Sequence, residues 1–498
     1  MANVRCSLWS AGVVLSLLGG CGAVGPDYAE PTSSNAAALA SFPSVAEVAT
    51  TGTIVAAAPP AQWWQALHDP DLDVLISQAL AANNDLQVAV ANVEAARAQL
   101  EQVETRRLPS ADANGTVRER REAQAAQRKA DAHEVAPIRS IGTFGVDLLW
   151  EVDLFGRVRR SVEAASAELG SLEAVRNNVL LSVLSTVANA YVDLRGAQLR
   201  LGVAQRNVAV QQQTLDLVTT LNTEGAATDL DVARARTQLL TSLASIPQQR
   251  AAARAALNRL TSLLAQAPGT LDGQLQTPRA LPVLPDLVAV GQPADLLRRR
   301  PDIQVAERAL AAASARIGVA TADLFPTVTL IGGAGVSASP LGALAAAGAP
   351  FFTFGPALRW NIFDRAAIYA RIAQADSSAA AGVARYQATV THALEEVDSA
   401  INAYGNERQR QAQLLAAVAA SRDAAQLAQL RFKEGAEDFL TVLDAERSLL
   451  ALEDQQAVSA INVTQSLIEI QRALGGGWQD AAVPALQSYR EQVNHTAP

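Results

Sequence analysis

The chain has 498 residues, few aromatic side chains and a formal net charge of −9. Lys129 and Lys433 are its only lysines. No concentrated basic face of the kind that binds phosphate backbones is present in the sequence, which argues against a nucleic-acid partner. The four histidines are scattered, and no phosphate loop, nucleophile elbow or zinc-ligand spacing occurs. We therefore expect neither an enzyme nor a metal site.

The N-terminus predicts export and lipid attachment. Residues 1–20 contain a positive charge at Arg5 and then an apolar run too short to span a bilayer, which is typical of a secretory signal. The sequence Leu18-Gly19-Gly20-Cys21 fits a lipoprotein processing box, so we expect covalent lipid on Cys21, no other cofactor and no disulfide in the mature chain. The alternative is an ordinary signal with an incidental cysteine. Gly22 favours transfer to the outer membrane, and residues 21–65 are expected to form an extended, lipid-anchored segment.

The remainder of the chain is an internal tandem duplication. Asn84–Ala89 recurs as Pro301–Ala306, and Glu224-Gly225-Ala226 recurs as Glu434-Gly435-Ala436, in the same order. We place the first repeat at 66–280, the second at 281–478 and a C-terminal tail at 479–498. Each repeat is predicted to contain a helix, then strands, then very long helices.

Two long segments without proline, 157–224 and 357–483, predict the long helices. The first would measure on the order of 100 Å at about 1.5 Å per residue, far longer than a globular core. Turns at the two Glu-Gly-Ala sequences would make each repeat a long antiparallel hairpin, and Pro247 is expected to kink the returning helix of the first one. An apolar residue recurs every seven positions in the first segment, which predicts a coiled-coil seam. These residues are Leu180, Val187, Leu194, Leu201, Val208 and Leu215.

Four shorter segments alternate between apolar and polar residues and predict strands at about 108–118, 141–155, 324–337 and 351–363. An apolar outer face with polar residues opposite is typical of transmembrane barrel strands, although a soluble sheet with one buried face would show the same alternation. Four strands cannot close a barrel, and lipid does not tolerate open sheet edges, so several copies would have to share one barrel. The charged segment 118–139 would form an external loop.

Several ordered motifs carry a family resemblance over nearly the whole mature chain. They are Gly25-Pro26-Asp27-Tyr28, Trp63-Trp64, Trp150–Arg157, Asp295–Ile303, Leu443–Leu449 and Ala473–Trp478. With these motifs the chain resembles the outer-membrane factors of tripartite efflux systems, similar to TolC and to the OprM and NodT lipoprotein branch. The resemblance implies a mainly α fold with a transmembrane β part: a homotrimer whose long helices form an α-barrel and whose four strands per protomer form a shared 12-stranded β-barrel.

The resemblance also implies the function and its partners. The protein would be a passive export duct for drugs and toxic compounds, joined through a periplasmic adaptor to an inner-membrane pump of the resistance-nodulation-division type. The adaptor would meet the hairpin tips at Gly225, Ala226, Gly435 and Ala436. Leu440 and Asp444 match the residues that narrow the closed pore; otherwise Leu440 is a seam residue and Asp444 a surface charge.

Two other functions stay open at this stage. The same duct could serve type I protein secretion, or the chain could be a periplasmic coiled-coil lipoprotein without a pore. The alternating strand segments argue against the second, and nothing in the residues identifies the cargo.

Overall fold

The computed structural model describes residues 22–31, 41–48, 54–121 and 138–479. Cys21, most of the charged 118–139 segment and nearly all of the predicted tail lie outside the described residues. The chain divides into two compact units, and each unit combines segments of both repeats. Unit 1 contains 94–171 and 306–386 with the N-terminal residues, and unit 2 contains 172–305 and 387–498 with 32–93.

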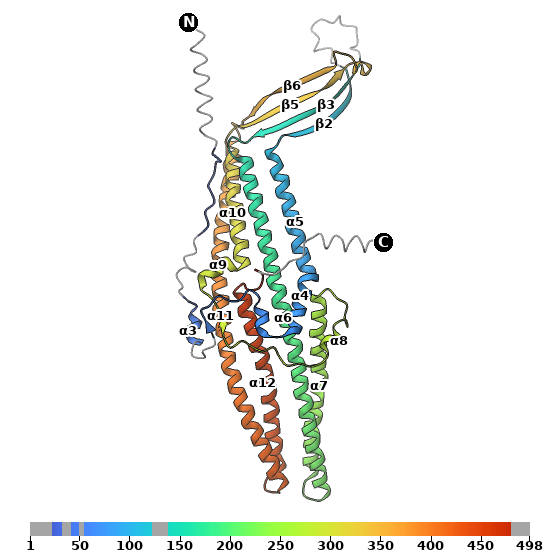
Figure 1. Ribbon diagram of the computed structural model, residues 1–498, viewed down its shortest axis with the longest axis vertical. Helices are drawn as coiled ribbons and strands as arrows, with labels where there is room; N and C mark the ends of the chain where they lie inside the picture. The colour runs from blue at the N-terminus through green and yellow to red at the C-terminus, as the bar shows by residue number, and fades with distance from the viewer. Residues whose placement is uncertain (1–21, 32–40, 49–53, 122–137, 480–498) are drawn as a thin grey trace. The chain divides into compact units, whose positions relative to one another are not determined.

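One antiparallel sheet of four strands dominates unit 1 (Figure 1). Its order is β2 (Ser110–Arg120), β3 (Arg139–Val152), β5 (Thr327–Ala338) and β6 (Pro350–Arg359). Two of the predicted strands extended too far at their C-terminal ends. Leu154 N donates to Val152 O at 2.8 Å and Ile362 N donates to Trp360 O at 3.1 Å. The backbone therefore turns tightly after each strand, before the next long helix begins.

The register of the sheet places apolar side chains in rows across one face. Val146 pairs with Ala334, which pairs with Phe352, and the next row joins Leu148, Gly332 and Phe354. Phe352 and Phe354 are 83% and 71% exposed, so this apolar face is uncovered in a single chain. The next residues along β3 and β6, Asp147 and Thr353, belong to the opposite, polar face because side chains alternate along a strand.

Residues 22–31 are hydrogen-bonded to the start of α6 (Arg157–Thr223) within unit 1. The Arg160 guanidinium is nearly buried and donates to Asp27 at 2.7 Å, to Val24 O at 3.1 Å and to Glu163 at 2.8 Å. Val24 N donates to Phe155 O at 3.1 Å. These bonds hold the segment that follows Cys21 against the junction of strand and helix.

Two antiparallel helical hairpins make up most of unit 2, which contains α6 from residue 172 and α11 from residue 387 (Figure 1). The first joins α6 to α7 (Asp229–Leu263), and the second joins α11 (Arg365–Lys433) to α12 (Phe439–Ala473). The long helices of 67 and 69 residues confirm the prediction from the proline-free segments. α7 continues through Pro247, so this proline does not end the helix. None of the helices in the described part of the chain has the length and hydropathy needed to cross a bilayer.

The predicted coiled-coil seam is present in only part of α6. Leu180, Val187 and Leu194 are almost completely buried, whereas Leu201 and Val208 are partly exposed. Further along the helix the buried positions are Gln211, Thr214 and Val218. These positions keep the seven-residue spacing but are offset from the predicted line of Leu201, Val208 and Leu215, so the buried face of the helix changes along its length.

A fully buried arginine organises the middle of unit 2. The side chain of Arg195 pairs with Asp71 at 2.7 Å and donates to the carbonyl of Thr277 at 3.0 Å. It also donates to the Tyr191 hydroxyl and to Gln198 Oε1. The guanidinium is therefore hydrogen-bonded on several sides, which is the condition for burying a charge without large cost.

The other helices and strands of the described residues are mostly short. They are α3 (Pro43–Val48), β1 (Ile54–Val55), η2 (Trp63–Leu67), α4 (Pro70–Ala82), α5 (Asn84–Glu104), η3 (Thr105–Arg107), α8 (Asp272–Leu275), β4 (Val288–Ala289), η5 (Pro293–Asp295), α9 (Leu296–Arg299), α10 (Pro301–Ala322) and η6 (Leu341–Ala343).

Candidate functional site: the hairpin tips

The two hairpins end in turns with the same hydrogen bonds. Ala226 N donates to Leu221 O at 2.7 Å in the first, and Ala436 N donates to Arg431 O at 2.9 Å in the second. The glycine before each alanine has a positive φ, +80° at Gly225 and +71° at Gly435, as the C-terminal motif of a helix requires. Both glycines are exposed, and a Cβ at either would meet no atom within 4 Å. The tips are therefore well-defined turns with open space around them.

Each returning helix starts with a capping side chain. Thr228 accepts from Asp231 N at 3.3 Å, and the Asp231 carboxylate accepts in return from Thr228 N, which completes a capping box. In the second hairpin Asp438 accepts from Thr441 N at 3.0 Å, and this bond holds the pKa of the Asp438 carboxyl below its ordinary value. The turns are thus fixed on both sides by local hydrogen bonds.

An apolar cluster joins the two hairpins just behind the tips. Its buried members come from all four helices: Val218, Ala235, Ala428, Phe439, Val442 and Leu443. The rings of Phe432 and Phe439 pack at 5.6 Å between centroids. Three of the buried side chains belong to the first turns of α12, so one face of this helix is fixed against the other three helices.

The opposite face of α12 carries the predicted gate residues. Leu440 is 49% exposed and Asp444 is also exposed, one turn further on. Asp444 forms no hydrogen bond or ion pair with the described residues. Arg447 continues the same stripe and donates from Nε to Gln238 Oε1 on α7 at 2.8 Å. The structure thus brings Leu440 and Asp444 together on one uncovered stripe near the second tip.

Further polar pairs connect α6 with α12 away from the tips. Arg200 pairs with Asp454 at 2.8 Å, and Gln465 donates to Asp193 at 2.7 Å. Nearer the tips, Thr214 Oγ1 donates to Glu446 at 2.8 Å. Glu446 was not predicted from the sequence, although a signal was present. It lies three residues after Leu443, on the buried face of α12, where a carboxylate is unexpected.

The chemistry of this region is that of a packed helical assembly with an exposed stripe on α12. No group of three or more possible metal ligands occurs in the residues that the structure covers. The stripe holds one apolar side chain and one unpaired carboxylate per chain. In a symmetric ring such a stripe would give an apolar constriction next to a ring of like charges, which is one way in which a channel is narrowed.

Known proteins are similar to this chain over nearly its whole length. The family model of outer membrane efflux proteins matches residues 75–266 and 293–476. The toluene efflux pump outer membrane protein TtgC of Pseudomonas putida is 32% identical over 97% of this chain and 98% of its own length. Nodulation protein T of Rhizobium leguminosarum bv. trifolii is 30% identical over 94% of this chain and 97% of its own length.

Solved structures are similar over nearly the whole fold. The outer-membrane channel OprN is 38% identical, with a TM-score of 0.85, and the match covers 92% of this chain and 99% of that one. The open state of the MtrE outer-membrane channel of Neisseria gonorrhoeae is 27% identical, with a TM-score of 0.76 and coverage of 92% and 99%.

The fold and the comparisons define an outer-membrane channel protein. The chain belongs to the outer membrane efflux protein family. It is the outer-membrane channel component of a tripartite efflux system, a transport protein and not an enzyme.

Proposed function

We propose that three copies of this chain form the channel, with their twelve strands closing one β-barrel and their long helices continuing it as an α-barrel. The main support for this proposal is the sheet of unit 1, which has unpaired edges and an exposed apolar face. β2 pairs only with β3 and β6 only with β5 among the described strands, so each has one unpaired edge, and one face is lined by exposed apolar side chains. Both features are satisfied when neighbouring copies pair edge to edge with the apolar face toward lipid.

The mass of the detergent-solubilised protein and its single-channel conductance test this proposal together. We expect a trimer that conducts small, seldom-opening currents in planar bilayers. A monomer without current would contradict the proposal and favour a coiled-coil lipoprotein without a pore.

We further propose that Cys21 carries lipid and anchors the protein in the outer membrane. The residues that follow it, Val24 to Asp27, are held against the start of α6 by Arg160, next to the end of β3. Mass spectrometry of the mature N-terminus should show an acylated Cys21, and a Cys21→Ser variant should lack that mass. An unmodified cysteine after a cleaved leader would contradict the proposal.

The exposed tips are the proposed docking points for the periplasmic adaptor. Gly225, Ala226, Gly435 and Ala436 are uncovered and small, so a helical partner could approach the backbone closely. Replacing Ala226 or Ala436 with Trp should prevent cross-linking to the adaptor in cells and leave the trimer intact. Leu427→Trp, on the exposed side of α11, is the control and should leave cross-linking unchanged. Equal cross-linking by all three variants would contradict the assignment.

Leu440 and Asp444 are the proposed periplasmic constriction. We expect the double variant Leu440→Ala with Asp444→Ala to raise single-channel conductance several-fold, because it removes both the apolar ring and the charge ring. Leu430→Ala with Asp423→Ala changes the same residue types at exposed positions of α11 and serves as the matched control. Unchanged conductance in the gate variant would contradict the assignment.

The proposed cargo is small hydrophobic or toxic compounds delivered by an inner-membrane pump of the resistance-nodulation-division type. TtgC is named for toluene efflux and SrpC of Pseudomonas putida for solvent efflux. Deleting the channel should lower the tolerated concentration of such compounds, and the intact gene should restore it. Unchanged tolerance together with lost export of a protein would favour the type I secretion alternative.

A further inference from the structure

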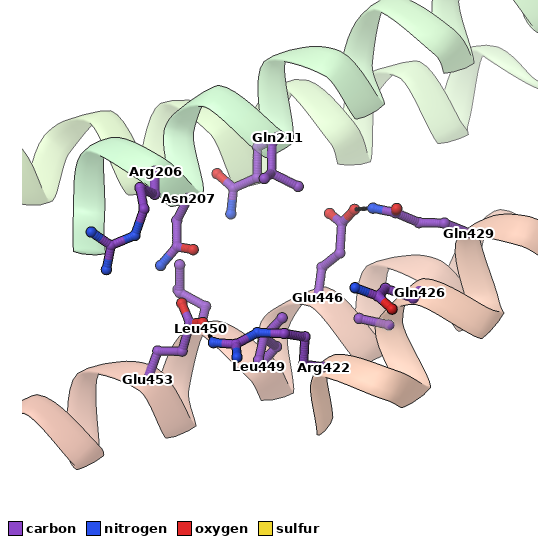
Figure 2. A pocket seen from close by; sticks show the side chains of 12 residues that line it. Arg206, Asn207, Gln211, Arg422, Gln426, Gln429, Glu446, Leu449, Leu450 and Glu453 are labelled. Carbon is purple, nitrogen blue, oxygen red and sulfur yellow. Dashed lines mark hydrogen bonds and ion pairs between the residues drawn. The ribbon is translucent and has the colours of Figure 1, made fainter. Parts of the chain in front are cut away.

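A half-enclosed cavity lies between the two hairpins behind the tips, inside unit 2 (Figure 2). It has a volume of about 440 Å³ and is lined by α6, α11 and α12. Pockets that take small organic molecules commonly measure roughly 300–1,000 Å³. Val210, Leu449 and Leu450 supply apolar wall, so the cavity is not simply a water channel between polar helices.

One end of the cavity holds a carboxylate without a cation. Glu446 is only 7% exposed, and its Oε1 accepts from Thr214 at 2.8 Å and from Gln429 at 2.7 Å. No Arg, Lys or His among the described residues forms an ion pair with it. A buried carboxylate that has only neutral donors is costly, because their hydrogen bonds compensate only part of its lost hydration.

A second acceptor at the cavity is left without any partner. Gln211 of α6 is 4% exposed, and its side-chain oxygen Oε1 is buried with no hydrogen-bond donor among the described residues. Figure 2 shows its side chain at the wall of the cavity, across from the helix that carries Glu446, and a rotation of the amide would turn Oε1 into the open space. Buried polar atoms in native proteins nearly always have a partner, so this one indicates a donor that the chain itself does not supply.

The cationic side chains of the cavity do not fill this role. Arg422 is paired with Glu453 at 2.7 Å. Arg206 is exposed, and in Figure 2 it lies at the end of the cavity away from Glu446. Neither arginine therefore compensates the negative charge at the Glu446 end.

We propose that this cavity binds a small organic cation with an apolar body and a planar amidinium or guanidinium head. The head donates to the Glu446 carboxylate on α12 and, after a rotation of the Gln211 amide, to Gln211 Oε1 on α6, while the body packs on Val210, Leu449 and Leu450. A planar head with several N–H donors matches two acceptors better than a compact ammonium does. Since the two acceptors belong to different hairpins, the bound cation links the hairpins in the packing seen here.

Benzamidine is the probe, and benzamide, which has the same ring without the charge, is its neutral counterpart. Titration calorimetry on the purified full-length protein should show saturable benzamidine binding and at least about tenfold weaker binding of benzamide, because a charge-assisted hydrogen bond is lost. Glu446→Gln should weaken benzamidine binding to a similar extent. Glu395→Gln, the same change at an exposed position of α11, should leave it unchanged.

Gln211→Leu provides a second variant that keeps the fold, since it only removes an unpartnered acceptor. It should weaken benzamidine binding several-fold and leave the helix content by circular dichroism unaltered. The proposal is overturned if benzamidine does not bind saturably, if benzamide binds equally well, or if both the Glu446 and the Gln211 variants bind as the unaltered protein does.

Discussion

In unit 2, the middle of the hairpins and their tip end are built from the same helices, but the buried positions of these helices differ in chemistry. In the middle, α6 buries Leu180, Leu184 and Leu194, and the buried charge of Arg195 is hydrogen-bonded on several sides. Toward the tips the buried positions of α6 become Gln211 and Thr214, and a cavity opens between the hairpins. Dense apolar packing stabilises a single arrangement of the helices, whereas a few polar contacts can be exchanged for others at a lower cost in free energy.

This difference indicates that the middle and the tip end of the two hairpins have different roles. The middle holds the hairpins in register, and the tip end keeps the apolar cluster, a few polar pairs and the exposed stripe of Leu440 and Asp444. Such an asymmetry would let the tip ends move while the middle stays packed. The following changes test it, from the largest expected effect to the smallest.

Removing the buried arginine should have the largest effect. Asp71 keeps its more exposed pair with Arg279 at 2.8 Å, but Arg195→Ala removes the buried guanidinium and leaves the acceptors Gln198 Oε1 and Thr277 O without this donor. We expect a loss of about 3–5 kcal/mol in the opening free energy of the middle region. Hydrogen exchange of the α6 amides measures it. Arg200→Ala, which removes the more exposed pair with Asp454, should cost less than about 1 kcal/mol. Equal losses in the two variants would show that burial does not distinguish the two pairs.

Deleting apolar volume should come next. Leu184 is 1% exposed, and Leu184→Ala should lower the free energy of unfolding by about 2–5 kcal/mol because it leaves a cavity. Leu427 is 59% exposed near the tips, and Leu427→Ala should change it by no more than about 0.5 kcal/mol in either direction. Thermal unfolding followed by circular dichroism compares the two. A tip variant as unstable as the middle one would mean that the assembled protein buries Leu427.

The turn glycines should show a moderate and strictly local effect. Alanine at Gly435 would have to adopt a positive φ, which costs about 1 kcal/mol relative to glycine. We expect faster amide exchange at the second tip only. Gly342→Ala, at a glycine with no positive φ and open space around it, is the control and should leave exchange at the tip unchanged. Slower exchange at the tip would contradict the role of the left-handed turn.

The smallest effect should be a dependence on pH at the start of α12. Thr441 N–H lowers the pKa of the Asp438 carboxyl, so the ionised form is favoured in the folded tip. The cap therefore stabilises the tip above the unfolded pKa of about 4 and loses this contribution as the pH falls through the lower folded value. The exchange of the Thr441 amide, corrected for its intrinsic rate, should rise at acidic pH. Asp438→Asn keeps an accepting oxygen and should remove the dependence, whereas a dependence that persists would assign it to another group.

The sequence by itself determined the elements and their order. The absence of proline from 157–224 and 357–483 predicted the two long helices, and the alternation of apolar and polar residues predicted the four strands. Both signals are local, because helix breakers and side-chain periodicity act within a few residues. The repeated Glu-Gly-Ala sequences likewise predicted the two turns, whose glycines have the expected positive φ.

Only the tertiary structure decided which helix faces are paired and where polar groups are buried. The heptad pattern predicted a seam in α6 that continues to Leu215, but the buried positions in this part of the helix include Gln211 and Val218. The neighbouring helices, and not the period alone, determine which face is in contact. Arg195 finds its partner Asp71 far away in the sequence, and Glu446 meets Thr214 from the other repeat. Such pairs depend on how four helices pack together, which no local pattern encodes.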